Sequence, residues 1–162
     1  MRFLMQSARR KVAFALAFVF ALLPLAGGWA GGTKTADANR TFEGNVMPLA
    51  EALAKSGTKI DADTAPYHLV LRTADGKLHP LIKDEGSRMF FKDAKLLNRP
   101  MRLTARVVPN SPYLQVITVH SLVKGKLHDI YYWCDVCVIK RYEAGICDCC
   151  GDAMVFREEA VK

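Results

Sequence analysis

Five cysteines concentrated in one short segment constrain this chain more than any other feature, since all five lie between Cys134 and Cys150. Two Cys-x-x-Cys pairs stand out, Cys134 with Cys137 and Cys147 with Cys150. Two intervening residues allow a tight turn that directs both sulfur atoms towards one centre, and the turn amides can donate to the thiolates. Four thiolates from two such turns form the tetrahedral ligand set of zinc, with Zn–S distances of about 2.3 Å. The spacing therefore predicts a metal site formed by these four residues.

The fifth cysteine, Cys149, leaves alternatives open. It is either an alternate ligand, with Cys147-x-Cys149 as a tighter chelating pair, or a free or exchange-prone thiol. Disulfides are a second interpretation of the whole cluster, because exported proteins commonly contain them. Bridges among such closely spaced cysteines would, however, strain the S–S geometry and close very small loops. A set of redox-switching thiols is the third interpretation, and metal binding is the one that the spacing favours.

The ligand chemistry leaves three metals open and favours one of them. Four soft thiolates suit zinc, a single iron ion or cuprous copper, and a closed site without a redox partner favours zinc. Met154 is compatible with copper but is expected in the small apolar core of the segment. His128 precedes the cluster and is expected at the surface. Haem attachment is excluded, because no histidine follows either Cys-x-x-Cys pair.

The segment also resembles the short rubredoxin-like zinc ribbons, such as the one appended to rubrerythrins. The resemblance rests on the two cysteine pairs, on Trp133 before the first, on Gly151 after the second and on Phe156 beyond it. It implies that the four paired cysteines are the ligands. The chain departs from the pattern at Val138, where these ribbons usually have glycine, and this departure weakens the case for iron.

The N-terminal residues 1–30 have the pattern of a secretory signal peptide. Four basic residues precede the apolar run 12–23, and small residues lead up to Ala30, after which we expect cleavage. An uncleaved anchor is the alternative, although the run is short of the ~20 residues that span a bilayer. The sequence thus predicts an exported protein, periplasmic or secreted, with no membrane span after cleavage and with a flexible lead-in over residues 31–40.

Removal of residues 1–30 lowers the net charge that the sequence predicts for the mature protein. The whole chain has 23 basic and 16 acidic residues, a net charge of +7, but residues 1–30 contain four basic and no acidic ones. The remainder therefore has 19 basic against 16 acidic residues, a net charge of +3. A nucleic-acid partner is not expected from so small an excess. An unidentified protein or small ligand is the expected partner.

Residues 41–125 show the alternation of short strands. Strands are predicted over 41–49, 67–73, 77–82, 101–107 and 114–123, with a short helical or loop excursion at 50–55 and a helix at 86–98. Asp75-Gly76 predicts a tight hairpin turn with positive φ at both central residues. Pro80 predicts that its strand is at an edge or bulged.

This order of elements resembles the OB-fold, a small five-stranded barrel with one helix. The predicted class is therefore mainly β (α+β), with an OB-like barrel over 41–125 followed by a four-cysteine metal-binding ribbon over 126–162. No Ser-His-Asp set, phosphate-binding glycine loop or paired catalytic carboxylates stand out, so the chain is not expected to be an enzyme. Its expected role is an exported binding or assembly module with a structural zinc site. The alternative is periplasmic redox or metal handling: iron electron transfer, thiol exchange, or copper or zinc carriage.

Overall fold

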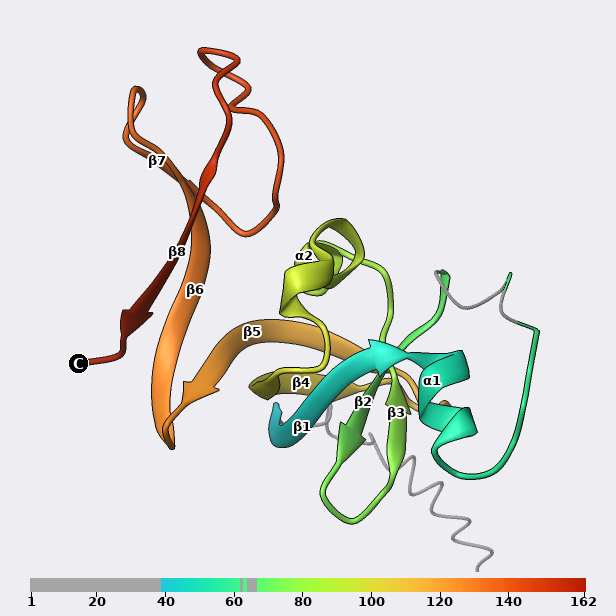
Figure 1. Ribbon diagram of the computed structural model, residues 1–162. Helices are drawn as coiled ribbons and strands as arrows, with labels where there is room; N and C mark the ends of the chain where they lie inside the picture. The colour runs from blue at the N-terminus through green and yellow to red at the C-terminus, as the bar shows by residue number, and fades with distance from the viewer. Residues whose placement is uncertain (1–38, 62, 64–66) are drawn as a thin grey trace, which may run out of the picture. The chain divides into compact units, whose positions relative to one another are not determined.

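The computed structural model describes residues 39–61, 63 and 67–162, and its described strands form one open antiparallel sheet (Figure 1). The strand order is β3-β2-β1-β4-β5-β6-β7, and β8 pairs with β6. The strands are β1 (Arg40–Pro48), β2 (Leu69–Thr73), β3 (Leu78–Pro80), β4 (Pro100–Val107), β5 (Leu114–Val123), β6 (Lys126–Cys134), β7 (Ile139–Arg141) and β8 (Val155–Ala160). Two short α-helices, α1 (Leu49–Ala54) and α2 (Arg88–Lys92), and the 3-10 turn η2 (Ala94–Leu96) complete the described elements. The mainly β class is confirmed.

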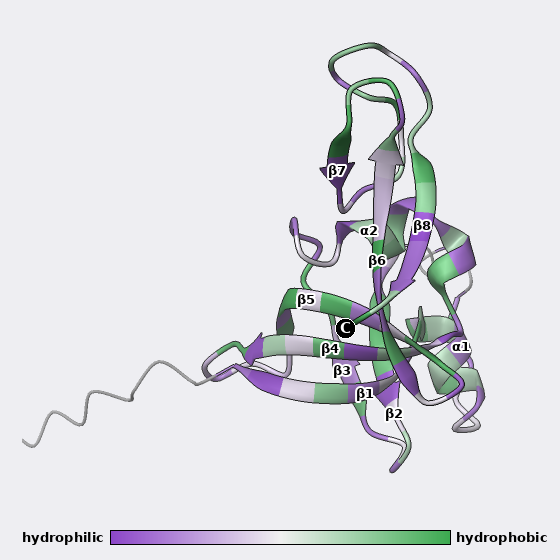
Figure 2. Ribbon diagram, turned by 90° about the vertical axis from the view of Figure 1, so that its left-hand side faces the viewer, coloured by the Kyte–Doolittle hydropathy of each residue, from purple (hydrophilic) through white to green (hydrophobic). Residues whose placement is uncertain are grey.

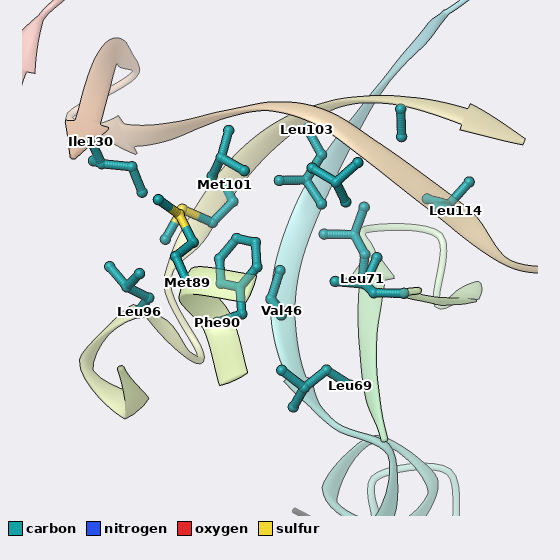
Figure 3. Close-up of a cluster of buried hydrophobic side chains, with 14 of the residues drawn as sticks. Val46, Leu69, Leu71, Met89, Phe90, Leu96, Met101, Leu103, Leu114 and Ile130 are labelled. Atoms are coloured by element: carbon teal, nitrogen blue, oxygen red, sulfur yellow. The ribbon is translucent and has the colours of Figure 1, made fainter. Parts of the chain in front are cut away.

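The hydrophobic core lies between the sheet and α2. Alternate residues of β4, namely Met101, Leu103 and Ala105, are fully buried, as their period of two predicts. Met89 and Phe90 of α2 lie among the core side chains (Figure 3). In Figure 2, bands of hydrophobic and hydrophilic colour follow one another along β4. The five strands predicted between residues 41 and 123 correspond to β1–β5, with small differences at their ends.

The predicted five-stranded barrel is wrong, because the described strands form an open sheet and not a closed barrel. Beyond the strand ladders, an isolated parallel bridge joins Leu81 to Leu114, and the amide of Ile82 donates to the carbonyl of Leu114 at 3.0 Å. The β3 strand ends at Pro80, which has no N–H to extend a ladder. On the other side of β4, β5 continues the sheet by pairing with β6.

The single helix predicted over residues 86–98 is also wrong in its length. The helix α2 covers five residues and ends at Lys92, and the next residue, Asp93, is extended with a φ of −128°. The Asp93 carboxylate accepts a hydrogen bond from the amide of Lys95 and thereby caps η2. Aspartate favours such local bonds over the helical ladder, which is why one apolar pattern yields two short pieces.

The hairpin at Asp75-Gly76 is confirmed, but its turn type is not. Only Gly76 has positive φ there, at 83°. The turn with positive φ at both central residues lies instead at Lys124-Gly125, with values of 50° and 75°, where Val123 pairs with Lys126. This backbone geometry matches the right-handed twist of the flanking strands and starts β6 directly beside β5.

The strand β6 connects the sheet to the cysteine-rich segment, and the sequence patterns missed it. Residues 126–129 pair with β5, residues 132–134 pair with β7, and residues 128–133 pair with β8 (Figure 1). Since one strand has only two edges, β5 and β7 share one edge of β6 and β8 occupies the other. Strand β8 changes from hydrophobic to hydrophilic along its length (Figure 2). All described residues belong to one compact unit.

The predicted signal peptide over residues 1–30 lies outside the described residues, as does most of the predicted lead-in over 31–40. Within the described part of the chain, no helix has both the length and the apolar character needed to cross a bilayer.

Candidate metal centre

Two chain reversals with the same local design hold the cysteine pairs, and we name them the cysteine turns (residues 134–138 and 147–151). In the first, the amide of Val138 donates to the carbonyl of Cys134 at 2.9 Å. In the second, the amide of Gly151 donates to the carbonyl of Cys147 at 2.8 Å. The first turn lies between β6 and β7, and the second precedes β8. The pairing of β7 and β8 with β6 brings the two turns together.

The four predicted ligands converge at this point. The Sγ atoms of Cys134, Cys137, Cys147 and Cys150 all lie within 4.8 Å of one another, and those of Cys134 and Cys150 are 3.5 Å apart. A tetrahedral zinc ion with Zn–S bonds of about 2.3 Å needs sulfur atoms about 3.8 Å apart. The arrangement of the four thiols therefore fits a single ion of this kind.

Burial differs among the four thiols. Cys134 and Cys147, the first member of each pair, are only 1% and 2% exposed. Cys137 is half-buried and Cys150 is exposed. One side of the cluster thus faces the protein and the other faces solvent.

Backbone amides lie where thiolates would be stabilised. The amide of Cys137 donates to the Sγ of Cys134 at 3.4 Å. The amides of Cys150 and Cys149 lower the pKa of the Cys147 thiol to about 7. The pKa of Cys137 is raised, first of all by a hydrogen bond with the neighbouring Cys149 thiol. Amide donors that favour the charged form of a thiol are typical of tetrathiolate sites.

The fifth cysteine is not one of the group of four. Cys149 is exposed and is not a member of the cluster that the structure brings together. All five cysteines are described, and none of them forms a disulfide in this structure. Cys149 therefore stays an exposed thiol at the edge of the cluster, close enough to Cys137 to affect its pKa.

The loop that carries the second cysteine turn is held by polar contacts that the sequence patterns missed. The amide of Cys147 donates to the carbonyl of Asp152 at 2.7 Å, and the Cys150 thiol donates to the Asp152 carboxylate at 3.7 Å. Arg141 of β7 forms an ion pair with Asp148 at 2.9 Å and donates to the carbonyl of Ile146 at 3.3 Å. Spacing could not identify these partners, because each depends on how the loop folds back.

The residues that flank the cysteines and contribute to the resemblance to zinc ribbons have defined positions in the structure. Phe156 packs against the core with its ring 5.6 Å from that of Tyr132, and Met154 packs there too. Trp133 is half-buried on the opposite face of β6, with Arg157 5.3 Å from its ring. His128 lies away from the cysteines, with Nδ1 3.1 Å from the carbonyl oxygen of Lys126.

A scan against protein-family models, a search of curated proteins and a search of solved structures each found no match to this chain.

Proposed function

We propose that this chain is a small exported protein in which one zinc ion, bound by Cys134, Cys137, Cys147 and Cys150, stabilises a C-terminal ribbon (residues 126–162). The observation that carries the proposal is the convergence of the four Sγ atoms within 4.8 Å from two turns of the same design. Zinc suits this ligand set because it accepts four thiolates in a tetrahedron and requires no redox partner.

The role of the ion in this proposal is structural. The cysteine-rich tip of the ribbon (residues 134–153) buries little apolar surface. Several of its hydrophobic side chains are exposed: Val136, Val138, Ile139 and Ile146. Structural zinc contributes an apparent binding free energy on the order of 10–16 kcal/mol to folding. A bound ion would therefore offset the entropy of ordering a segment that its own hydrophobic contacts cannot stabilise.

The remaining part of the proposal concerns the sheet. The order β3-β2-β1-β4-β5, with the parallel bridge between Leu81 and Leu114, supports an OB-like relationship for residues 41–125. On this proposal the sheet is a binding or assembly module. The resemblance of the ribbon to rubredoxin-like zinc ribbons supports the metal-binding part of the proposal.

The predicted signal peptide supports export of the protein. The N-terminal sequence of the mature protein, which we expect to begin at Gly31, tests this part of the proposal.

Elemental analysis of the protein purified from its export compartment tests the metal site. We expect one equivalent of zinc per chain and no visible absorbance. In Cys137→Ser the zinc content should fall well below one equivalent, whereas the matched control Cys149→Ser should retain it, because Cys149 lies outside the cluster. Normal zinc retention in Cys137→Ser, or a metal-free, fully oxidised wild-type protein, would contradict the proposal.

A second candidate function is metal or thiol handling, and the exposed Cys149 thiol beside Cys137 is the observation that favours it. A fifth thiol offers a route for ligand exchange during transfer of zinc or cuprous copper. This candidate predicts that Cys149→Ser slows the transfer of zinc to a competing chelator without changing the zinc content. A tetrathiolate ferric site would instead be coloured, so absorbance separates electron transfer from both other roles.

A further inference from the structure

A large cavity opens beside β5, away from the cysteines. Its volume is about 890 Å³, and six consecutive residues of β5, 115–120, line it. In a strand, consecutive side chains point to opposite faces, so a wall made of consecutive residues is the edge of the strand and not one of its faces. The other walls come from residues 84–86 and Met89, from Asp129 of β6, from Tyr142, and from the last residues of the chain, 159–162.

Among the described strands, none pairs with this edge of β5 over part of its length. On one edge β4 pairs with β5 from Leu114 to Ser121, except at Ile117, and on the other edge β6 pairs with β5 only from His120 onward. At the opposite end Leu114 is bridged to Leu81, and Gly86 packs so closely that an added Cβ would lie 1.9 Å from the carbonyl oxygen of Val116. Between these contacts, Ile117 and Thr118 are exposed within the described residues. A free strand edge is a template for another extended chain.

The edge is irregular at this point, which limits how far a partner strand can extend. The register between β4 and β5 shifts between Thr104 and Ala105, leaving Ile117 as an extra residue on β5. Such a bulge twists the strand locally. Backbone pairing is therefore confined to a few residues, and side chains that enter the cavity must supply the rest of the affinity.

The chemistry of the cavity favours a cation on an apolar stem. Buried Met89, Val116 and Val119 contribute apolar surface. Four carboxylates line the same cavity: Asp84, Glu85, Asp129 and Glu159. Lys162 is the one lysine or arginine among the lining residues of this described cavity, although Asp129 is also paired with Lys140 at 2.5 Å. Lysine and arginine side chains match this combination, since their stems bury against apolar surface while the charge stays near carboxylates.

We propose that this cavity binds an extended polypeptide segment that pairs with the β5 edge near Ile117 and places a lysine or arginine side chain among the carboxylates. A polypeptide is favoured over a free amine because only a polypeptide can form backbone hydrogen bonds along the strand edge. The peptide segment is a partner for the sheet, which the proposed function treats as a binding module. In that respect the inference rests on the proposed function. It does not involve the cysteines.

The test uses the zinc-loaded full chain and fluorescence anisotropy of a labelled valine–lysine–valine–lysine–valine peptide. Binding should weaken about tenfold in the double variant Asp84→Asn, Glu85→Gln and should also weaken as salt rises, because partly exposed charges are screened. The matched control Glu43→Gln, which removes an exposed carboxylate paired with Arg102 on β4, should leave binding unchanged. Ile117→Lys, at an exposed position, should abolish binding by placing a competing cation at the edge.

Four outcomes would overturn the proposal: absence of binding at millimolar peptide, equal binding of the glutamate-containing analogue, equal binding of N-acetyl-lysine amide, or no loss on N-methylation of the peptide amides. Self-association that buries the β5 edge, detected by sedimentation and removed by Ile117→Lys, would also overturn it. Circular dichroism and zinc content of each sample verify that the variants fold. A protein without zinc that still binds the peptide would refute the proposed metal site and not this cavity.

Discussion

Val138 and Gly151 occupy equivalent positions in the two cysteine turns, one residue after the second cysteine of each pair, and both have positive φ, at 57° and 79°. Glycine adopts this conformation without steric cost, whereas a β-branched residue there is strained. Val138 is also 67% exposed, so no burial of its side chain compensates for the strain. The first cysteine turn is thus the less favourable half of the candidate metal centre.

Relief of this strain should strengthen metal binding. We expect Val138→Gly to stabilise the first cysteine turn by about 1 kcal/mol, which corresponds to roughly fivefold tighter zinc binding in competition with a chelator. Gly151→Ala should weaken binding by a similar factor, since no atom lies within 4 Å of the added Cβ and only the backbone conformation opposes it. Unchanged affinity in both variants would show that φ at these positions does not limit metal binding.

Removal of the metal should unfold the tip of the ribbon and spare the sheet. After chelation, we expect amides between residues 134 and 153 to exchange at rates close to those of an unfolded chain. Those of Leu103 in β4 and Val116 in β5 should remain protected, because these residues belong to the buried core. Hydrogen exchange with mass spectrometry measures both regions in one sample. Retained protection at the tip would mean that the metal has no structural role.

Tyr132 of β6 connects the ribbon to the α2 region. Its hydroxyl donates to the Asp93 carboxylate at 2.8 Å, and the side chain is buried. We expect Tyr132→Phe to lower the free energy of unfolding by about 1.5–3 kcal/mol, the usual contribution of a hydrogen bond to a charged acceptor. Urea denaturation at neutral pH measures the change, and the surface variant Tyr113→Phe serves as a control without this bond.

The same tyrosine predicts a pH dependence. Burial, followed by the bond to Asp93, raises the pKa of Tyr132 above its ordinary value of 10. Above pH 10 the unfolded chain therefore loses this proton while the folded chain keeps it, so stability is complete below pH 10 and declines above it. The slope from this residue should approach about 1.4 kcal/mol per pH unit and should be absent in Tyr132→Phe. Parallel pH profiles of the two proteins would contradict this.

Glu158 of β8 is bonded to two residues from other parts of the chain. Its carboxylate accepts from the hydroxyl of Ser121 on β5, which is fully buried, and from Arg99, each at 2.5 Å. Glu158→Ala would leave both donors without this acceptor, and we expect a loss of about 2–3 kcal/mol in the free energy of unfolding. The exposed pair of Glu43 with Arg102 offers a comparison, where Glu43→Ala should cost about 0.5 kcal/mol. Equal losses in the two variants would refute the role of Glu158.

Local patterns predicted much of the sheet. The alternation of β4 was predicted correctly because a strand with one buried face must repeat every two residues, and Met101 and Leu103 are fully buried. The length of α2 was predicted wrongly. The hydrogen bond between the Asp93 carboxylate and the amide of Lys95 ends the helix in the middle of an apolar pattern. The continuous strand β6 was also missed, since its partners β7 and β8 stabilise it from residues that follow it in the chain.

The spacing of Cys134, Cys137, Cys147 and Cys150 was sufficient by itself to identify the thiols that come together, because two residues between cysteines determine the geometry of each turn locally. Only the tertiary structure decided that the sheet stays open, that Val138 adopts positive φ and that a cavity lies beside β5. Strand closure and the placement of carboxylates around a free edge depend on pairing between distant segments. No local pattern encodes that pairing, because it is set by the packing of the whole chain.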